Sequence, residues 1–193
     1  MSEVKHDNRM LAIGLALGGA ACLIYAALSR HWLVDGRVEV MFGLRDNISC
    51  GLAEHCDPIS NSELVDAIQH MSGNAPDMAS SAFAPMGWVT MITCSLAALG
   101  LLVAGALGLA KKRPMLPISP STVALLAIMA GLISGCVFVA TKPGGVGYVG
   151  VSLGFWLFGI GSVAGIAGAQ LLAKINRAPD PDLMDGAMNP DDF

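Results

Sequence analysis

Four long runs of the chain contain no Asp, Glu, Lys, Arg or His, and this feature constrains the fold more than any other. The runs cover residues 10–28, 86–110, 118–140 and 149–173, and each has 19 to 25 residues. A helix of about 20 apolar residues crosses a hydrocarbon core of about 30 Å. A soluble core helix of that length would carry a polar stripe, which these runs lack. We therefore expect an all-α membrane protein with four transmembrane helices in up-down-up-down order.

The composition agrees with this expectation. Only 13% of the residues are charged, and the mean hydropathy is +0.61. Soluble domains usually carry about 25% charged residues. The lipid bilayer is therefore the first expected partner, and we expect no nucleic-acid partner.

The first apolar run could be mistaken for a secretion signal, because Lys5 and Arg9 precede it. The apolar part of a signal peptide has at most about 15 residues and is followed by small residues at a cleavage site. The run at 10–28 is longer, and Arg30, His31 and Trp32 follow it. We expect it to be retained as a membrane helix.

The lysines and arginines near the helix ends predict the orientation, because cytoplasmic loops carry an excess of them. If the N-terminus is cytoplasmic, the inner side has seven such residues and the outer side has four. The inner set is Lys5, Arg9, Lys111, Lys112, Arg113, Lys174 and Arg177, and the outer set is Arg30, Arg37, Arg45 and Lys142. We therefore expect a multi-pass protein of the plasma or inner cell membrane, with both termini in the cytoplasm.

This orientation divides the chain into three parts. Residues 1–9 are expected to be a cytoplasmic tail, and residues 174–193 a disordered acidic cytoplasmic tail. Residues 10–173 form the membrane domain, with an extracytoplasmic loop at 29–85 and a short one at 141–148.

The long loop has local patterns of its own. Val38, Val40 and Phe42 alternate with polar or flexible side chains, which predicts a half-buried strand. Residues 61–70 read as a short amphipathic helix with Asn61 as its N-cap.

Two glycine pairs have the spacing that allows helix backbones to approach closely in lipid. They are Gly14 with Gly18 in the first run, and Gly161 with Gly165 in the fourth. We expect both pairs to pack helices within the chain, with dimerisation as the alternative.

Five cysteines divide into two groups. Cys22, Cys94 and Cys136 lie in the apolar runs, where a thiol behaves as a small apolar residue. Cys50 and Cys56 lie in the long loop, which is an oxidising compartment in this orientation. We expect a disulfide between them, contributing about 2–3 kcal/mol by closing a small ring.

The alternative for the loop cysteines is a metal site. Cys50, His55 and Cys56 would be its ligands, together with His31 or His70. Adjacent ligands at 55 and 56 chelate one ion poorly, and the spacing fits no zinc pattern. We therefore expect no metal and no cofactor.

The loop also resembles that of the claudin and peripheral myelin protein superfamily. The matching residues are Trp32, Gly43, Leu44, Cys50 and Cys56, within four apolar runs and with a short second loop. Arg45 departs from the Gly-Leu-Trp element of the family, and the interval from Trp32 to Gly43 is shorter than usual.

The resemblance implies a left-handed four-helix bundle with a small β-sheet on its outer face. The two loop cysteines would join neighbouring strands, while Trp32, Gly43 and Leu44 would seat the sheet on the bundle. Members of this superfamily act in lateral self-association, adhesion, paracellular sealing or as auxiliary channel subunits.

The sequence bears on three classes of function. A non-enzymatic structural, adhesion or accessory subunit fits best, acting through the long loop and lateral helix contacts. That loop has eight acidic and three basic residues, which favours basic partners or cations, although an ordinary solvated loop would look the same. The alternative is an oligomeric channel or small transporter subunit, although such proteins usually carry ionisable groups at membrane depth. No haem-attachment motif or nucleophile–base grouping is visible, so we do not expect an enzyme.

Overall fold

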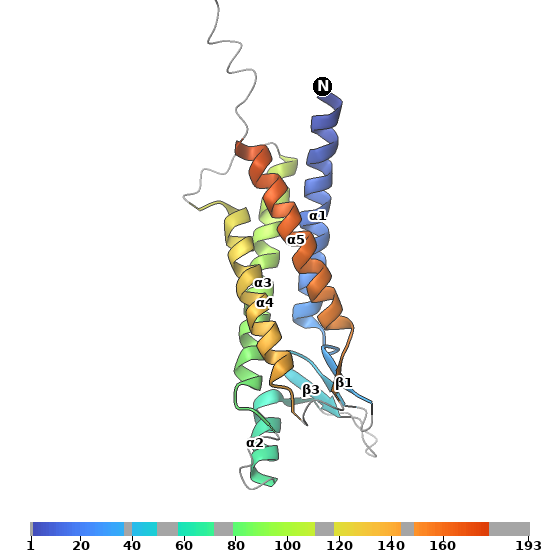
Figure 1. Cartoon of the computed structure of the whole chain (residues 1–193), viewed down its shortest axis with the longest axis vertical. Helices are drawn as coiled ribbons and strands as arrows, with labels where there is room; N and C mark the ends of the chain where they lie inside the picture. Colours follow the sequence, from blue (N-terminus) through green and yellow to red (C-terminus); the bar gives the residue numbers. More distant parts are fainter. Residues whose placement is uncertain are drawn as a thin grey trace, which may run out of the picture.

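Four long helices form a bundle with a small sheet at one end (Figure 1). They are α1 (Ser2–Leu28), α3 (Phe83–Leu109), α4 (Pro120–Ala140) and α5 (Leu153–Arg177). The structure, a computed structural model, describes residues 2–36, 40–49, 58–71, 79–110, 118–143 and 149–177. Each of the four helices is long and apolar enough to cross a membrane, so the predicted multi-pass membrane architecture is confirmed at this level.

The four helices alternate in direction. α1 packs against α3 and α5, and α4 packs against the same two helices. α1 begins and α5 ends at the end of the bundle opposite the sheet (Figure 1). Both loops expected on the outer side therefore meet at the other end.

Helix boundaries differ most from the predicted ones in α1 and α5. α1 begins at Ser2, so part of the predicted tail at 1–9 is helical, and its membrane-length segment is Asn8–Leu28. The predicted helix at 149–173 begins only at Leu153 and runs on to Arg177.

Residues 149–151 form a strand rather than the first helical turn. β5 (Val149–Val151) pairs with β1 (Leu33–Asp35), and Leu33 lies opposite Val151. The Ser152 amide then donates to the Trp32 carbonyl at 2.8 Å, just before α5 begins. Pairing with β1 supplies partners for backbone groups that a helix would otherwise have to satisfy within itself.

The sheet has five antiparallel strands in the order β4-β3-β2-β1-β5. Besides β1 and β5 they are β2 (Val40–Phe42), β3 (Asp46–Ser49) and β4 (Pro58–Ser60). β2 contains the predicted strand positions Val40 and Phe42, whereas Val38 lies outside the described residues. The second loop thus contributes a strand to a sheet formed mainly by the first.

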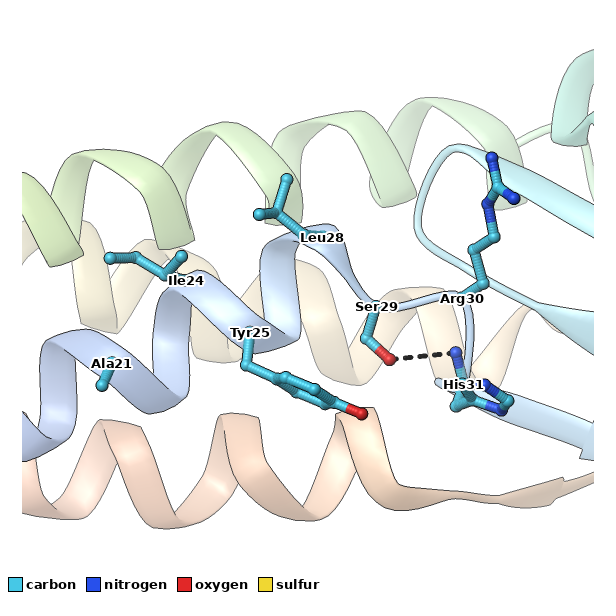
Figure 2. Close-up of a pocket in the computed structure, with 7 residues that line it drawn as sticks. All are labelled: Ala21, Ile24, Tyr25, Leu28, Ser29, Arg30 and His31. Atoms are coloured by element: carbon cyan, nitrogen blue, oxygen red, sulfur yellow. Dashed lines mark hydrogen bonds between the residues drawn. The ribbon is translucent and has the colours of Figure 1, made fainter.

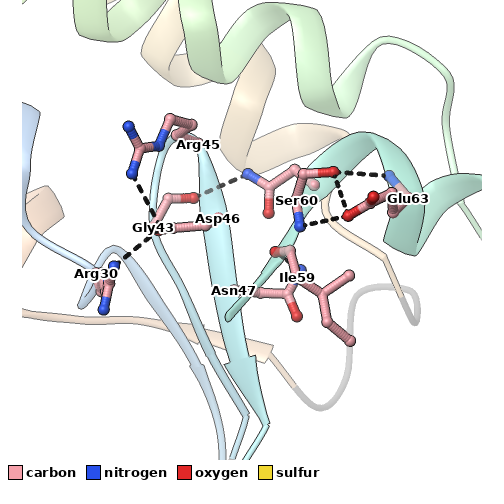
Figure 3. A network of polar contacts seen from close by, with 9 residues as sticks. Arg30, Gly43, Arg45, Asp46, Asn47, Ile59, Ser60 and Glu63 are labelled. Atoms are coloured by element: carbon pink, nitrogen blue, oxygen red, sulfur yellow. Dashed lines mark hydrogen bonds and ion pairs between the residues drawn. The ribbon is translucent and has the colours of Figure 1, made fainter. Parts of the chain in front are cut away.

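The short helix α2 (Asn61–Met71) follows β4 and agrees with the predicted amphipathic helix. Its predicted N-cap is wrong by one residue. Ser60 Oγ accepts a hydrogen bond from the Glu63 amide at 3.2 Å, and Glu63 Oε2 accepts one from the Ser60 amide at 3.1 Å (Figure 3). This is a capping box, and it frees Asn61 to turn inward, where it is buried.

The interface between α1 and α5 is made of small residues. Ala12, Ala16 and Ala20 on α1 are completely buried. A Cβ atom added at Gly168 of α5 would lie 2.5 Å from the Ala16 amide nitrogen, and one added at Gly161 would lie 2.8 Å from Cys22 Cβ. Close backbone approach of this kind replaces the hydrophobic driving force that is missing between helices in lipid.

Gly14 and Gly18 are not part of this interface, which corrects the prediction of intrachain packing for that pair. Both are exposed, and a Cβ atom at either would meet nothing within 4 Å. The face of α1 that meets α5 lies one position further on, at Gly19. A Cβ atom there would be 2.7 Å from the Gly165 amide nitrogen, so Gly165 does face a neighbouring helix.

Candidate interaction platform

The sheet and α2 together project from one end of the bundle, and we call them the platform (Figure 1). It consists of β1 to β5 and α2, with residues 29–32 and 43–45 as its links to the bundle. Four of its strands come from the first loop and one from the second. It is the largest described region outside the predicted membrane spans and the first place to look for a binding surface.

Trp32 anchors the platform to three helices. Its side chain is completely buried. The indole Nε1 donates to the Ala26 carbonyl of α1 at 2.6 Å. Its ring centroid lies 5.9 Å from that of Phe138 on α4 and 5.2 Å from that of Phe158 on α5.

The aromatic contacts continue from Trp32 across the sheet end of the bundle. Phe138 stacks on Phe83 of α3 at 4.5 Å, and Phe83 meets Phe42 of β2 edge to face at 6.2 Å. Phe155 contacts Trp32 from the other side, at 6.2 Å. Every phenylalanine between residues 42 and 158 is therefore in this cluster. Four of the five, all but Phe42, lie near the loop ends of the predicted spans, and this was the sequence signal that could have predicted the cluster.

Gly43 and Leu44 form the second attachment point. A Cβ atom at Gly43 would lie 3.1 Å from Arg30 Cα, and the Gly43 carbonyl accepts from Asn61 Nδ2 at 3.0 Å. Leu44 is buried, and its carbonyl oxygen occupies the space that a Cβ atom at Gly87 would need. Gly87 of α3 is thus required for the platform to approach the bundle, and sequence reasoning did not identify it.

Asp46 connects two arginines beside this attachment point. Its Oδ2 atom lies 3.2 Å from Arg30 Nη2 and 3.4 Å from Arg45 Nη2 (Figure 3). The Asp46 side chain is only 13% exposed. Arg45, which stands where the family pattern has tryptophan, is part of this charged group instead of the aromatic cluster.

Three exposed aromatic side chains mark the membrane boundary near the platform. They are Tyr25 on α1, Trp88 on α3 and Trp156 on α5, which are 43%, 46% and 60% exposed. Each lies within the last or first two turns of its helix at the sheet end. Tyr and Trp are enriched at membrane–water interfaces, so these residues place the platform outside the hydrocarbon core.

Cys50 and Cys56 lie outside the described residues, as does His55, so the disulfide and the rival metal site remain predictions. His31 and His70 are described and exposed. Within the described segments no group of three His, Cys, Asp or Glu side chains could hold a metal ion.

No family model matches the chain, and no curated protein matches it. The claudin likeness therefore stays a prediction. What the structure supports directly is a multi-pass architecture of four membrane-length helices with a small antiparallel sheet fixed to one end.

Proposed function

We propose that the chain is a non-enzymatic accessory or structural subunit of the cell membrane, which binds a protein partner through the platform. The platform would lie on the extracytoplasmic side, as the distribution of lysine and arginine predicts. Lateral contacts between exposed helix faces and other membrane proteins would support the same role.

The rigid attachment of the platform carries this proposal. Its sheet contains strands from both loops, and Trp32 joins it to α1, α4 and α5. Leu44 and Gly87 join it to α3. A surface held in this way loses little conformational entropy on binding, which favours recognition of a partner.

The charge of the first loop, which supplies most of the platform, points to the chemistry of that partner. The loop from 29 to 85 contains eight acidic and three basic residues. Glu63 and Asp66 are exposed on α2. Hydrogen bonds from the Ser60 side chain and backbone lower the pKa of Glu63 below its usual value of 4.5. Glu63 is ionised at neutral pH with or without this shift. A basic surface on the partner would be attracted at long range.

The interior of the bundle supports a packing role in preference to transport. The buried polar side chains in the described parts of the four spans are hydroxyls: Thr90, Ser121, Ser134 and Ser162. Thr90 Oγ1 donates to Ser134 Oγ at 2.9 Å, which joins α3 to α4. Transport pathways usually place ionisable groups at this depth.

A pair of charge variants tests the proposal. Asp66→Asn with Ala67→Lys raises the net charge on the exposed side of α2 by two units, because it removes one carboxylate and adds one ammonium group. Asn8→Lys with Ala110→Lys raises the net charge at the opposite end of the bundle by the same two units. All four positions are exposed. Partners would be purified in mild detergent at low and high salt and quantified by mass spectrometry.

We expect a partner with a basic surface that is retained by the wild type and the Asn8/Ala110 variant, and lost by the Asp66/Ala67 variant. High salt should weaken the same association. An unchanged set of partners in both variants would contradict the proposal.

A further inference from the structure

Arg30 and Arg45 form a positively charged pair at the edge of the platform. Both guanidinium groups share the single carboxylate of Asp46, so the three side chains together carry one net positive charge. In the described contacts each guanidinium uses only its Nη2 atom, and the two side chains are 45% and 56% exposed. A guanidinium carries five N–H donors in a planar fork, so both arginines have further donors with which to bind phosphate oxygens.

A hollow of about 230 Å³ lies beneath this arginine pair. It lies between the end of α1, residues 44–46 and the first turns of α3. Met91 of α3 lines this hollow, and it lies one helical turn further from the platform than the exposed interfacial Trp88. The hollow is therefore at the depth where lipid headgroups meet the hydrocarbon core.

A second hollow of about 260 Å³ lies next to the first, in the crevice between α1 and α3. The two share Ala27 and Leu28, and we call them together the furrow. The walls of its deeper part are Ile24, Ala98, Leu99 and Leu102, with Ser95 as the one hydroxyl. Ser95 Oγ donates to the Met91 carbonyl at 2.8 Å, so its hydrogen is already used within α3.

A further hollow of about 600 Å³ lies on the other side of α1, and Arg30 lines it together with Tyr25 and His31. Figure 2 shows Tyr25 and His31 beside α5, while Arg30 points to the side of α1 nearer α3. The positive charge of Arg30 is therefore directed toward the furrow. The furrow thus has two arginine side chains at its platform end and an apolar crevice at its deeper end.

We infer that the furrow binds one phospholipid with an anionic headgroup, from the leaflet on the platform side. Its phosphate would be held by Arg30 and Arg45, and one acyl chain would lie along the crevice between α1 and α3. This lipid site does not depend on the protein partner proposed above, because it lies on the membrane-facing side of the links that join the platform to the bundle.

Quenching by brominated lipids measures this binding. A Trp156→Phe chain, which retains buried Trp32 and interfacial Trp88, would be placed in phosphatidylcholine nanodiscs. A minor fraction of the lipid would carry brominated chains on either phosphatidylglycerol or phosphatidylcholine. We expect the phosphatidylglycerol to quench Trp88 with an apparent affinity about fivefold higher, as one net charge near a membrane surface provides. Equal quenching by the two lipids would overturn the inference.

Charge variants separate the arginine pair from the general surface potential. Arg30→Gln with Arg45→Gln should abolish the preference for phosphatidylglycerol, and Arg30→Lys with Arg45→Lys should retain most of it. Asp46→Asn removes the competing carboxylate and should raise the preference by about a further fivefold. If the preference for phosphatidylglycerol remains after both arginines are replaced, it arises from other charges of the protein, and the proposed site is wrong.

Removing both arginines leaves Asp46 poorly exposed and unpaired, so a folding control is needed. The triple variant Arg30→Gln, Arg45→Gln and Asp46→Asn relieves this charge and should still lack the preference. A preference restored in the triple variant would overturn the assignment to the arginines.

The furrow itself is tested by filling it. Ser95→Phe places a ring in the crevice and should reduce quenching by brominated phosphatidylglycerol, whereas Ile160→Phe on the exposed side of α5 should not. Added inorganic phosphate should displace little lipid, because it cannot occupy the crevice. Full displacement by phosphate, or no effect of Ser95→Phe, would contradict a bound phospholipid.

Discussion

Trp32 completes the end of α1 as well as filling the aromatic cluster. The last carbonyl groups of a helix have no partner within it. α1 ends at Leu28, and the indole of Trp32 supplies the donor for the Ala26 carbonyl at 2.6 Å. One side chain thus caps a membrane helix and holds the platform above it.

Substituting Trp32 should separate these two contributions. Trp32→Phe keeps an aromatic ring but leaves a buried carbonyl unpaired, which we expect to cost about 1–3 kcal/mol. Trp32→Ala also removes the ring contacts, and we expect about 3–5 kcal/mol or loss of the folded protein. Thermal unfolding in detergent measures both. Trp156→Ala is the control, since that side chain is 60% exposed, and equal melting temperatures for the Trp32 and Trp156 variants would refute the anchor role.

The capping box of α2 makes a prediction about pH. Bonds from the Ser60 side chain and backbone lower the pKa of Glu63 below 4.5 in the folded protein. A lowered folded-state pKa adds stability above the unfolded pKa, and this is lost as pH falls through the folded value. We therefore expect the start of α2 to loosen only below about pH 4.5. Ser60→Ala should raise the Glu63 pKa in an NMR titration, and Ser62→Ala should not; an unchanged pKa in Ser60→Ala would refute the capping box.

Among the glycines of α5, four pack against neighbouring atoms, whereas Gly159 does not. A Cβ atom at Gly168 would lie 2.5 Å from the Ala16 amide nitrogen, whereas one at Gly159 would meet nothing within 4 Å. Backbone atoms cannot move aside as a flexible side chain can. The two positions therefore form a matched pair within one helix.

We expect Gly168→Ala to destabilise the bundle by about 1–3 kcal/mol or more, as overpacking does. Gly161→Leu should be worse, because its Cβ would already lie 2.8 Å from Cys22 Cβ and leucine adds three more carbon atoms beyond it. Gly159→Leu and Gly18→Ala should leave the melting temperature in detergent nearly unchanged. Destabilisation of all four variants to the same degree would mean that glycine content, not the α1–α5 contact, governs stability.

That these helices exist could be predicted from the sequence, but which side of each helix is buried could not. Uniformly apolar helices have no polar stripe to show which side is buried. α1 has small residues on several sides, so Gly14 and Gly18 looked as suitable as Gly19, which makes the contact. β5 was missed for a related reason. Its three residues form a strand only because β1, more than a hundred positions earlier, supplies the partner.

At the scale of the molecule, the platform depends on contacts between residues far apart in the sequence. Trp32, Gly43 and Leu44 were singled out through a family resemblance, and the structure places all three at the attachment to the bundle. Their partners Gly87 and Phe138 belong to other helices, and no local pattern connects them with the loop. The far end of the bundle has a contact of the same type, in which Arg9 Nη2 donates to the Gly108 carbonyl at 2.6 Å.

The orientation of the molecule is the remaining prediction, and two exposed positions test it. Ala67 lies on α2 of the platform, and Asn8 lies near the start of the α1 span at the opposite end. Ala67→Cys should react with a membrane-impermeant maleimide in intact cells, and Asn8→Cys only after permeabilisation. The parent chain, labelled in parallel, accounts for its own cysteines. Seven lysines and arginines on the predicted inner side, against four outside, are the physical basis of this expectation. The reverse labelling pattern would place the platform in the cytoplasm, where a stable disulfide between Cys50 and Cys56 is not expected.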